Sequence, residues 1–265
     1  MMRLTVKAIY DKKKKREKIT VLTAYDHLLA GIVDRSGIDV VLVGDSLGMV
    51  LLGYPSTVQV TMRDMMHHTR AVSKAVTRAL VVADMPFGSY DTQEKALRNA
   101  KRFLQEAGAD AVKLEGGRKI RKQAEALIRA GIPVMGHLGL TPQTASSLGG
   151  YKVQGKARRE AQEILQDAVL LDKLGAFAIV LECVPAALGA KITRAVKCPT
   201  IGIGAGAKTD GQVLVITDML GFRTSVKMPR FVRTYASLSE TVERAVRGYA
   251  LDVISGKFPS KKESY

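Results

Sequence analysis

The sequence predicts a single-domain (β/α)8 barrel, a TIM barrel, over residues 1–265, and three observations lead to this prediction. Eight short apolar runs typical of buried parallel strands alternate with helical stretches over about 220 residues. A glycine suited to a helix C-cap precedes four of these runs. Several runs end in an acid or a base, as expected where the loops after barrel strands carry the chemistry. An open doubly wound sheet is the alternative, because the number of strands alone does not exclude it.

The chain begins with a basic leader, residues 1–18. Its densest run, Lys12–Lys18 (KKKKREK), lies before the first strand and is interpreted as a solvated segment. Ile19–Thr23 (ITVLT) is expected to be the first strand, and a helix is expected from about Asp26 to Ser36.

The remaining strands repeat one pattern, in which a helix is followed by an apolar run and then by a polar residue. Four runs have the preceding glycine: DVVLVGDS after Gly37, DAVKLEGG after Gly108, PVMGHLG after Gly131 and FAIVLECV after Gly175. Three runs without that glycine complete the set of eight: Ala79–Asp84, Pro199–Gly204 and Val213–Thr217.

The helices between the strands have recognisable starts. Thr61 is expected to cap one helix together with Asp64, a variant of the capping box, and Thr92 is expected to cap the next. The C-terminal part, residues 228–265, is predicted to hold a helix over about Leu238–Ser255 and a polar tail.

Two connections are longer than a barrel needs, residues 47–60 and 138–156. The second is rich in Gly, Ser and Thr, and we interpret it as a lid, because structureless loops of this length are usually lids or disordered segments.

Composition restricts the class of protein. Lys and Arg outnumber Asp and Glu by 41 to 25, a net charge of +16, but aromatic residues are only 5% and there is no Trp. A nucleic-acid partner is therefore disfavoured, because few side chains are available to stack on bases. No apolar run reaches the ~18 residues of a membrane helix. Two cysteines, Cys183 and Cys198, indicate reduced, buried thiols in a cytoplasmic protein rather than a disulfide framework.

Glycine spacing excludes one common cofactor motif. Gly202, Gly204 and Gly206 form GxGxG rather than GxGxxG, and they lie late in the chain instead of opening a first βαβ unit. The sequence therefore gives no support for a dinucleotide site.

Acidic residues end two neighbouring strands. Alternation along a strand predicts that Val41, Val43 and Asp45 point one way, and that Val82 and Asp84 do so on the next strand. Adjacent parallel strands lie ~4.8 Å apart, so the two carboxylates are able to converge on one divalent cation such as Mg²⁺. The alternative is that each aspartate caps a helix or pairs with a surface lysine.

Further ionisable residues follow on the next strands. Lys113 and Glu115 share one face of the fourth strand, where they form either a structural ion pair or a pair that holds a substrate carboxylate and the water shell of a metal. His137, after the fifth strand, is either structural or a donor to a substrate oxygen. Glu182 ends the sixth strand among apolar residues, which is typical of a carboxylate that acts as a general base.

Seven motifs in this order resemble the ketopantoate hydroxymethyltransferase family from about Ile19 to Phe231: VLVGDSLGM, VADMPFGSY, VKLEGG, PVMGHLGLTPQ, GGYKVQG, VLECVP and IGIGAGAKTDGQ. The resemblance implies a phosphoenolpyruvate/pyruvate-type barrel that transfers a hydroxymethyl group from 5,10-methylenetetrahydrofolate to 3-methyl-2-oxobutanoate, giving 2-dehydropantoate for pantothenate and coenzyme A. It also implies a homo-oligomer, commonly a decamer.

The resemblance further implies a role for each candidate residue. Asp45 and Asp84 would bind Mg²⁺, with Glu115 in the same cluster. Asp45, Ser46, Asp84 and Lys113 would bind the oxo acid, and Glu182 would remove the C3 proton to give an enolate that Mg²⁺ stabilises.

Two other classes stay open. The nearer is another Mg²⁺-dependent 2-oxo-acid lyase or aldolase of the same barrel group, although the sequence has VKLEGGRKIRK where those enzymes usually carry a KKCGH-like loop. The farther is a non-catalytic basic binding protein.

Overall fold

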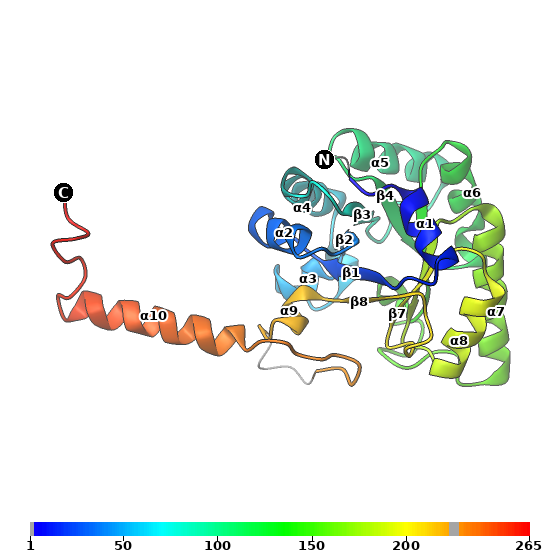
Figure 1. The fold of residues 1–265 in the computed structure, drawn as a ribbon. Coiled ribbons are helices and arrows are strands. Elements are labelled where there is room, and N and C mark those ends of the chain that lie inside the picture. Colours follow the sequence, from blue (N-terminus) through cyan, green and yellow to red (C-terminus); the bar gives the residue numbers. More distant parts are fainter. Residues whose placement is uncertain (1–2, 223–227) are drawn as a thin grey trace. The chain divides into compact units, whose positions relative to one another are not determined.

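The computed structural model describes residues 3–222 and 228–265, which form two compact units, Met1–Val215 and Ile216–Tyr265. The first unit is a closed barrel in which all neighbouring strands are parallel and follow one another in sequence order from β1 to β8. Pairing of Val21 with Val213 joins β1 to β8 and closes the ring (Figure 1). The predicted (β/α)8 barrel is therefore confirmed.

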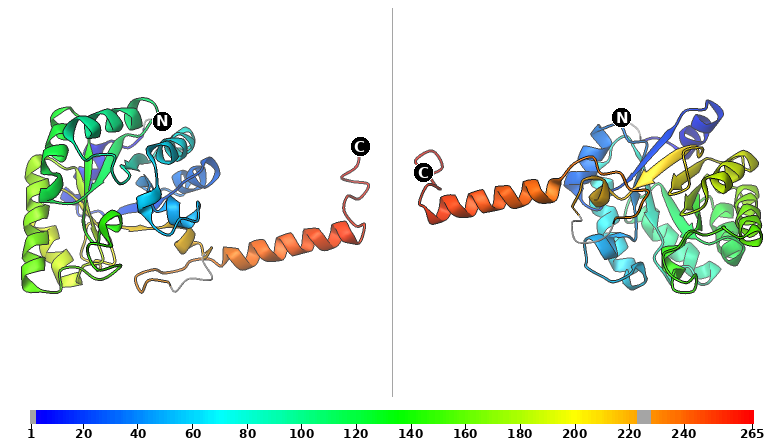
Figure 2. Two further views of the ribbon diagram at one scale, coloured as in Figure 1. Left: turned by 180° about the vertical axis from the view of Figure 1, so that it is seen from behind. Right: turned by 90° about the horizontal axis from the view of Figure 1, so that it is seen from below.

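The eight strands are short, and helices lie outside them in the views of Figure 2. Their bounds are β1 Ile19–Thr23, β2 Val40–Val43, β3 Leu80–Asp84, β4 Ala111–Glu115, β5 Val134–Gly139, β6 Ala178–Glu182, β7 Thr200–Ile203 and β8 Gly211–Leu214.

The described residues form ten α-helices and three 3-10 turns. The α-helices are α1 Val6–Lys14, α2 His27–Arg35, α3 Leu47–Val50, α4 Met62–Ala75, α5 Gln93–Gln105, α6 Arg121–Arg129, α7 Arg158–Leu174, α8 Ala186–Ala195, α9 Ile216–Met219 and α10 Leu238–Ile254. The 3-10 turns are η1 Thr57–Gln59, η2 Arg118–Ile120 and η3 Pro142–Thr144.

Two apolar layers hold the barrel together. Inward-facing side chains such as Val40, Val82 and Met135 fill its interior. Outward-facing side chains such as Ile179 and Leu181 pack against Leu171 of α7. This arrangement follows from the alternation of side chains along each strand, because both faces of a barrel strand are covered.

The predicted helix ends are confirmed. The Thr61 hydroxyl and the Asp64 carboxylate form a reciprocal capping box at α4, and Thr92 caps α5. The glycines expected after helices adopt left-handed φ angles, which are +83° at Gly37 and +102° at Gly175.

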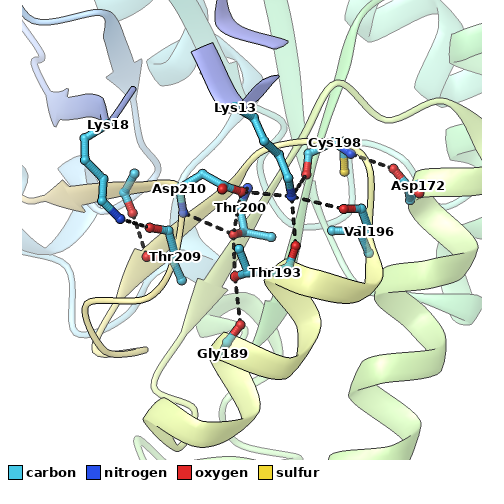
Figure 3. Close-up of polar contacts among 11 residues, drawn as sticks. Lys13, Lys18, Asp172, Gly189, Thr193, Val196, Cys198, Thr200, Thr209 and Asp210 are labelled. Atoms are coloured by element: carbon cyan, nitrogen blue, oxygen red, sulfur yellow. Dashed lines mark hydrogen bonds and ion pairs between the residues drawn. The ribbon is translucent and has the colours of Figure 1, made fainter. Parts of the chain in front are cut away.

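The expectation of a solvated leader holds only in part, because residues 14–18 are exposed whereas Lys12 and Lys13 are half-buried. Residues 6–14 form α1, in which Ile9 is fully buried against the barrel interior. The Lys13 ammonium donates to the carbonyl oxygens of Thr193, Val196 and Cys198 at 2.9–3.0 Å and pairs with Asp210 at 3.0 Å (Figure 3). These groups precede β7 and β8, so α1 covers the amino-terminal end of the barrel. Charge alone did not reveal this, because lysines also satisfy buried carbonyls.

The last strand also differs from the prediction. It spans Gly211–Leu214 rather than Val213–Thr217, and the end of the predicted run belongs to α9. Gly211 lies directly against the backbone carbonyl of Ile19, where a Cβ atom would clash. The strand therefore begins at a glycine that an apolar pattern does not mark.

The C-terminal unit contains α10, close to the predicted Leu238–Ser255 helix. None of the α10 residues is buried. Within residues 3–222 and 228–265, every helix is too short or too polar to cross a membrane.

Candidate active site

The carboxyl ends of β2 to β6 bring the predicted polar residues together. Asp84 lies at the end of β3, Lys113 and Glu115 at the end of β4, His137 on β5 and Glu182 at the end of β6. All but Glu182 are buried. The contacts below show that these side chains form one connected network.

Asp45 reaches this network by a different route from the one predicted. Val40 and Leu42, not Val41 and Val43, face the barrel interior, so strand alternation does not aim Asp45 inward. Asp45 instead lies in the turn after β2, where its backbone amide donates to Asp84 Oδ2 at 3.0 Å. Gly44 leaves room for the serine hydroxyl in this turn, because a Cβ atom there would lie 2.9 Å from Ser46 Oγ.

Ser46 lies beside Asp45 in the same turn. Its Oγ is 2.8 Å from the hydroxyl of Tyr25, a fully buried residue that follows β1. The serine hydroxyl is thereby oriented at the edge of the carboxylate cluster. This position is compatible with its predicted contact to an oxo acid.

Lys113 is the central cation of the site. Its Nζ lies 2.6 Å from Asp84 Oδ1 and 3.4 Å from His137 Nδ1. Burial by itself would lower the pKa of this ammonium, but Asp84, Glu115 and Asp45 raise it above its ordinary value. Burial and the charges of Asp84 and Glu115 raise the pKa of Asp45 well above its ordinary value.

His137 lies between two glutamates. Its Nδ1 is 3.2 Å from Glu115 Oε1 and its Nε2 is 3.1 Å from Glu182 Oε2. Burial and Lys113 oppose protonation, but Glu115 and Glu182 raise the pKa of His137 to about 9. His137 and Lys113 in turn hold the pKa of Glu115 below its ordinary value despite its burial. Both ring nitrogens of His137 face carboxylates, so the predicted donation to substrate requires one of these contacts to change.

Two residues of the network were not found by sequence reasoning, Tyr90 and Gln143. The Tyr90 hydroxyl donates to Gln143 Oε1 at 2.5 Å, and the Gln143 backbone amide donates to Glu115 Oε2 at 3.0 Å. Both residues lie in loops after strands. The motifs ADMPFGSY and GLTPQ contain them, but no spacing or charge pattern distinguishes them from ordinary loop residues.

The 138–156 segment contacts the site at several points. The Leu140 amide donates to the Glu182 carbonyl at 2.9 Å, and the Gln154 amide donates to the Cys183 carbonyl at 2.8 Å. Cys183 has a φ of +47°, a strained conformation for a residue with a side chain. The hydroxyl of Tyr151 lies 3.5 Å from Met49 Sδ, which connects the segment to α3. The segment therefore touches the β2 and β6 sides of the site, as a lid would.

The donor set fits one hard divalent cation. Asp45 and Asp84 are buried carboxylates in contact through a backbone amide, and Asp84 Oδ1 lacks a well-aligned hydrogen bond although Lys113 lies beside it. Two carboxylates together with water or substrate oxygens are a typical Mg²⁺ environment. In the described part of the chain, no group of three or more His, Cys, Asp or Glu side chains is arranged to hold a metal. Glu115, which was predicted to belong to the same cluster, contacts the Gln143 amide and His137 through its two carboxylate oxygens.

Known structures define the class of barrel. Phosphonopyruvate hydrolase, in a complex with oxalate and Mg²⁺, superposes with a TM-score of 0.64 at 14% identity, covering 98% of this chain and 93% of its own. The 2,3-dimethylmalate lyase of the PEP mutase/isocitrate lyase superfamily gives a TM-score of 0.57 at 15% identity, covering 99% and 92%. The chain therefore shares the barrel fold of these structures.

Sequence comparison defines the family within this class. The family model for ketopantoate hydroxymethyltransferase matches residues 3–261. The 3-methyl-2-oxobutanoate hydroxymethyltransferase of Syntrophus aciditrophicus is 55% identical over 264 residues, covering 99% of this chain and 97% of the relative. That of Dehalococcoides mccartyi is 53% identical, covering 100% and 94%. The chain belongs to the ketopantoate hydroxymethyltransferase family and is an enzyme of that family, which favours this interpretation over the lyase alternative.

Proposed function

We propose that this protein transfers a hydroxymethyl group from 5,10-methylenetetrahydrofolate to 3-methyl-2-oxobutanoate, giving 2-dehydropantoate for pantothenate biosynthesis. Family membership supports the reaction. The observation that carries the assignment of roles is the buried network, in which a carboxylate pair and a lysine lie on one side and a more accessible glutamate lies on the other.

The carboxylate pair and the lysine form the binding side. Asp45 and Asp84 would hold Mg²⁺, which when bound supplies a Lewis acid for the 2-oxo group of the substrate. Lys113 places a permanent positive charge beside Asp84, where it attracts the anionic oxo acid and stabilises negative charge that develops on the 2-oxo oxygen. Ser46 supplies a hydroxyl oriented by Tyr25 for the same substrate.

Glu182 is the proposed base. Its side chain is 17% exposed, against 3–4% for Glu115 and Asp84, so it is the carboxylate that a substrate reaches most easily. The Glu182 carboxylate accepts the proton from C3, and that carbon then forms a bond to the one-carbon unit. The bonds between this unit and the folate nitrogens break, water supplies the hydroxyl oxygen, and tetrahydrofolate is released. His137 Nε2 contacts the Glu182 carboxylate and thereby orients it, as a third group orients the base in other active sites.

Loss of the C3 proton signal of 3-methyl-2-oxobutanoate in D₂O, followed by NMR without folate, tests this assignment. We expect exchange that requires both a divalent cation and Glu182, so that chelator or Glu182→Gln stops it. Glu125→Gln on α6 is the matched control, because the ion pair of Glu125 with Arg129 lies within that helix. Exchange that persists in Glu182→Gln would remove Glu182 from its role as the base.

The assembly and the location of the protein are further parts of the proposal. Exposed apolar side chains on α10, such as Val246 and Ile254, support a homo-oligomer, and sedimentation velocity tests it. Cys183 and Cys198 are both free, which supports a reducing compartment such as the cytoplasm. Only Cys198 is buried, so the prediction of two buried thiols holds for one of them.

A further inference from the structure

Gln143 is a buried polar residue in a loop whose later part is largely exposed. It lies in η3 of the 138–156 segment and is 4% exposed, whereas Ser146, Ser147 and Tyr151 of the same segment are exposed. Long polar side chains are mostly exposed unless their hydrogen bonds are satisfied inside the protein. The burial of Gln143 therefore requires an explanation in its contacts.

The side-chain amide of Gln143 has a chemically fixed orientation. Its Nε2 donates to Asp45 Oδ2 at 2.8 Å and to the Met85 carbonyl oxygen at 2.9 Å, while its Oε1 accepts from the Tyr90 hydroxyl at 2.5 Å. A backbone carbonyl only accepts, so Nε2 must face Met85 and Oε1 must face Tyr90. Nε2 is therefore also directed at Asp45.

The backbone of the same residue contacts a second carboxylate, because the Gln143 amide donates to Glu115 Oε2 at 3.0 Å. One loop residue thus binds two acids that come from different strands, Asp45 after β2 and Glu115 at the end of β4. Both contacts require η3 of the 138–156 segment to lie in its present position at the carboxyl end of the barrel.

We propose that Gln143 is a positioning residue, through which the closed 138–156 segment fixes the rotation of the Asp45 carboxylate for cation binding. Gln143 does not touch the reacting atoms in this proposal. It holds Asp45 Oδ2 and thereby restricts rotation about the Cβ–Cγ bond of Asp45. The inference rests on the proposed function, because it takes Asp45 as a cation ligand. It also implies that cation binding and closure of the segment favour each other.

Mn²⁺ binding to substrate-free protein, measured by electron paramagnetic resonance, tests the proposal. Gln143→Met keeps a side chain of similar length but removes its hydrogen bonds, and we expect Mn²⁺ to bind about 10-fold more weakly, as for other residues that orient a metal ligand. Gln154→Met is the matched control in the same segment, because among the described residues the Gln154 side chain donates only to the Lys152 carbonyl. We expect its affinity to stay within about twofold of the unmodified protein.

Hydrogen–deuterium exchange gives a second readout that a merely structural role would not change. Mn²⁺ should slow exchange of amides in residues 144–156 of the unmodified protein and of Gln154→Met, and should have little effect in Gln143→Met. Equal Mn²⁺ affinity and equal protection in Gln143→Met would overturn the inference while leaving the proposed metal site in place. Absence of Mn²⁺ binding to the unmodified protein would overturn both.

A milder variant covers the case in which Gln143→Met does not fold, as judged by circular dichroism. Tyr90→Phe removes only the hydroxyl that holds Gln143 Oε1. We expect it to weaken Mn²⁺ binding about threefold, because the amide of Gln143 is then held on one side only. Unchanged binding in a folded Tyr90→Phe protein, together with an unfolded Gln143→Met protein, would assign Gln143 to stability and overturn the inference.

Discussion

The two ends of the barrel each contain a lysine paired with an aspartate, but the surroundings of the two pairs differ. At the amino-terminal end, Lys13 pairs with Asp210 at 3.0 Å and also donates to three backbone carbonyl oxygens (Figure 3). At the carboxyl end, Lys113 pairs with Asp84 at 2.6 Å, and its other polar neighbour is His137. Both ammonium groups are largely removed from water.

The difference lies in what balances the charge. Asp210 also accepts from the amide and hydroxyl of Thr200, so the amino-terminal pair is neutral and fully hydrogen-bonded. The carboxyl end gathers Asp45, Asp84, Glu115 and Glu182 around Lys113 and His137, which leaves more acids than bases. A hydrogen-bonded ion pair of this kind stabilises the fold, whereas a cluster in which acidic side chains outnumber basic ones is typical of a site that binds a cation and a substrate.

Lys113→Met should give the largest effect, since it leaves three buried carboxylates without their central cation. We expect proton exchange at C3 of the oxo acid to fall by about 10³-fold, as after loss of a donor to developing charge. We also expect the free energy of unfolding to fall by about 3 kcal/mol. Steady-state exchange rates and urea denaturation of the same preparation measure both quantities. A variant with normal exchange would show that Lys113 is only structural.

His137 makes the carboxyl end sensitive to pH. Its folded-state pKa of about 9 lies above the ordinary value of 6.5, so protonation of His137 stabilises the fold fully below pH 6.5. This stabilisation is lost as the pH rises through 9, and it amounts to roughly 3 kcal/mol. Urea denaturation of metal-free protein and of His137→Gln at pH 6 and pH 9.5 checks this. The unmodified protein should exceed His137→Gln in free energy of unfolding by less at pH 9.5 than at pH 6. A difference between the two proteins that does not depend on pH would contradict a charged His137.

Lys13→Met should separate stability from chemistry. The variant leaves three carbonyl oxygens and Asp210 without their shared donor, and we expect the free energy of unfolding to fall by about 2 kcal/mol. Exchange at C3 should be unchanged at temperatures where the variant is folded, because Lys13 lies at the opposite end of the barrel. A reduced rate in fully folded Lys13→Met would show that the two ends are coupled.

Lys18→Met should give the smallest effect and serves as a control for loss of charge. Lys18 also donates to a carbonyl oxygen at the amino-terminal end, that of Thr209 at 2.5 Å, but it is an exposed residue. Water replaces such a contact easily, so we expect a change of less than about 1 kcal/mol in thermal or urea denaturation. A loss of stability as large as that of Lys13→Met would mean that the difference in exposure between the two lysines does not determine how much each one stabilises the fold.

Sequence reasoning identified more of the polar residues at the carboxyl end of the barrel than at the amino-terminal end. Alternation along a strand correctly placed Lys113 and Glu115 on one face, because a regular strand preserves this alternation. The same rule gave the wrong reason for Asp45, since the turn at Gly44 interrupts the strand. Lys13 was missed because the carbonyl groups that hold it come from residues 193–198, far away in the sequence. Gln143 was missed because only tertiary contacts distinguish it from other loop glutamines.

The most direct test compares Lys13 with Lys113 in one experiment. Lys13→Met and Lys113→Met are assayed side by side for C3 proton exchange with Mg²⁺ and for the free energy of unfolding. We expect Lys13→Met to lose stability and keep its exchange rate per folded molecule, and Lys113→Met to lose exchange even where it is folded. The same pattern of losses in both variants would contradict the division between a structural and a catalytic end of the barrel.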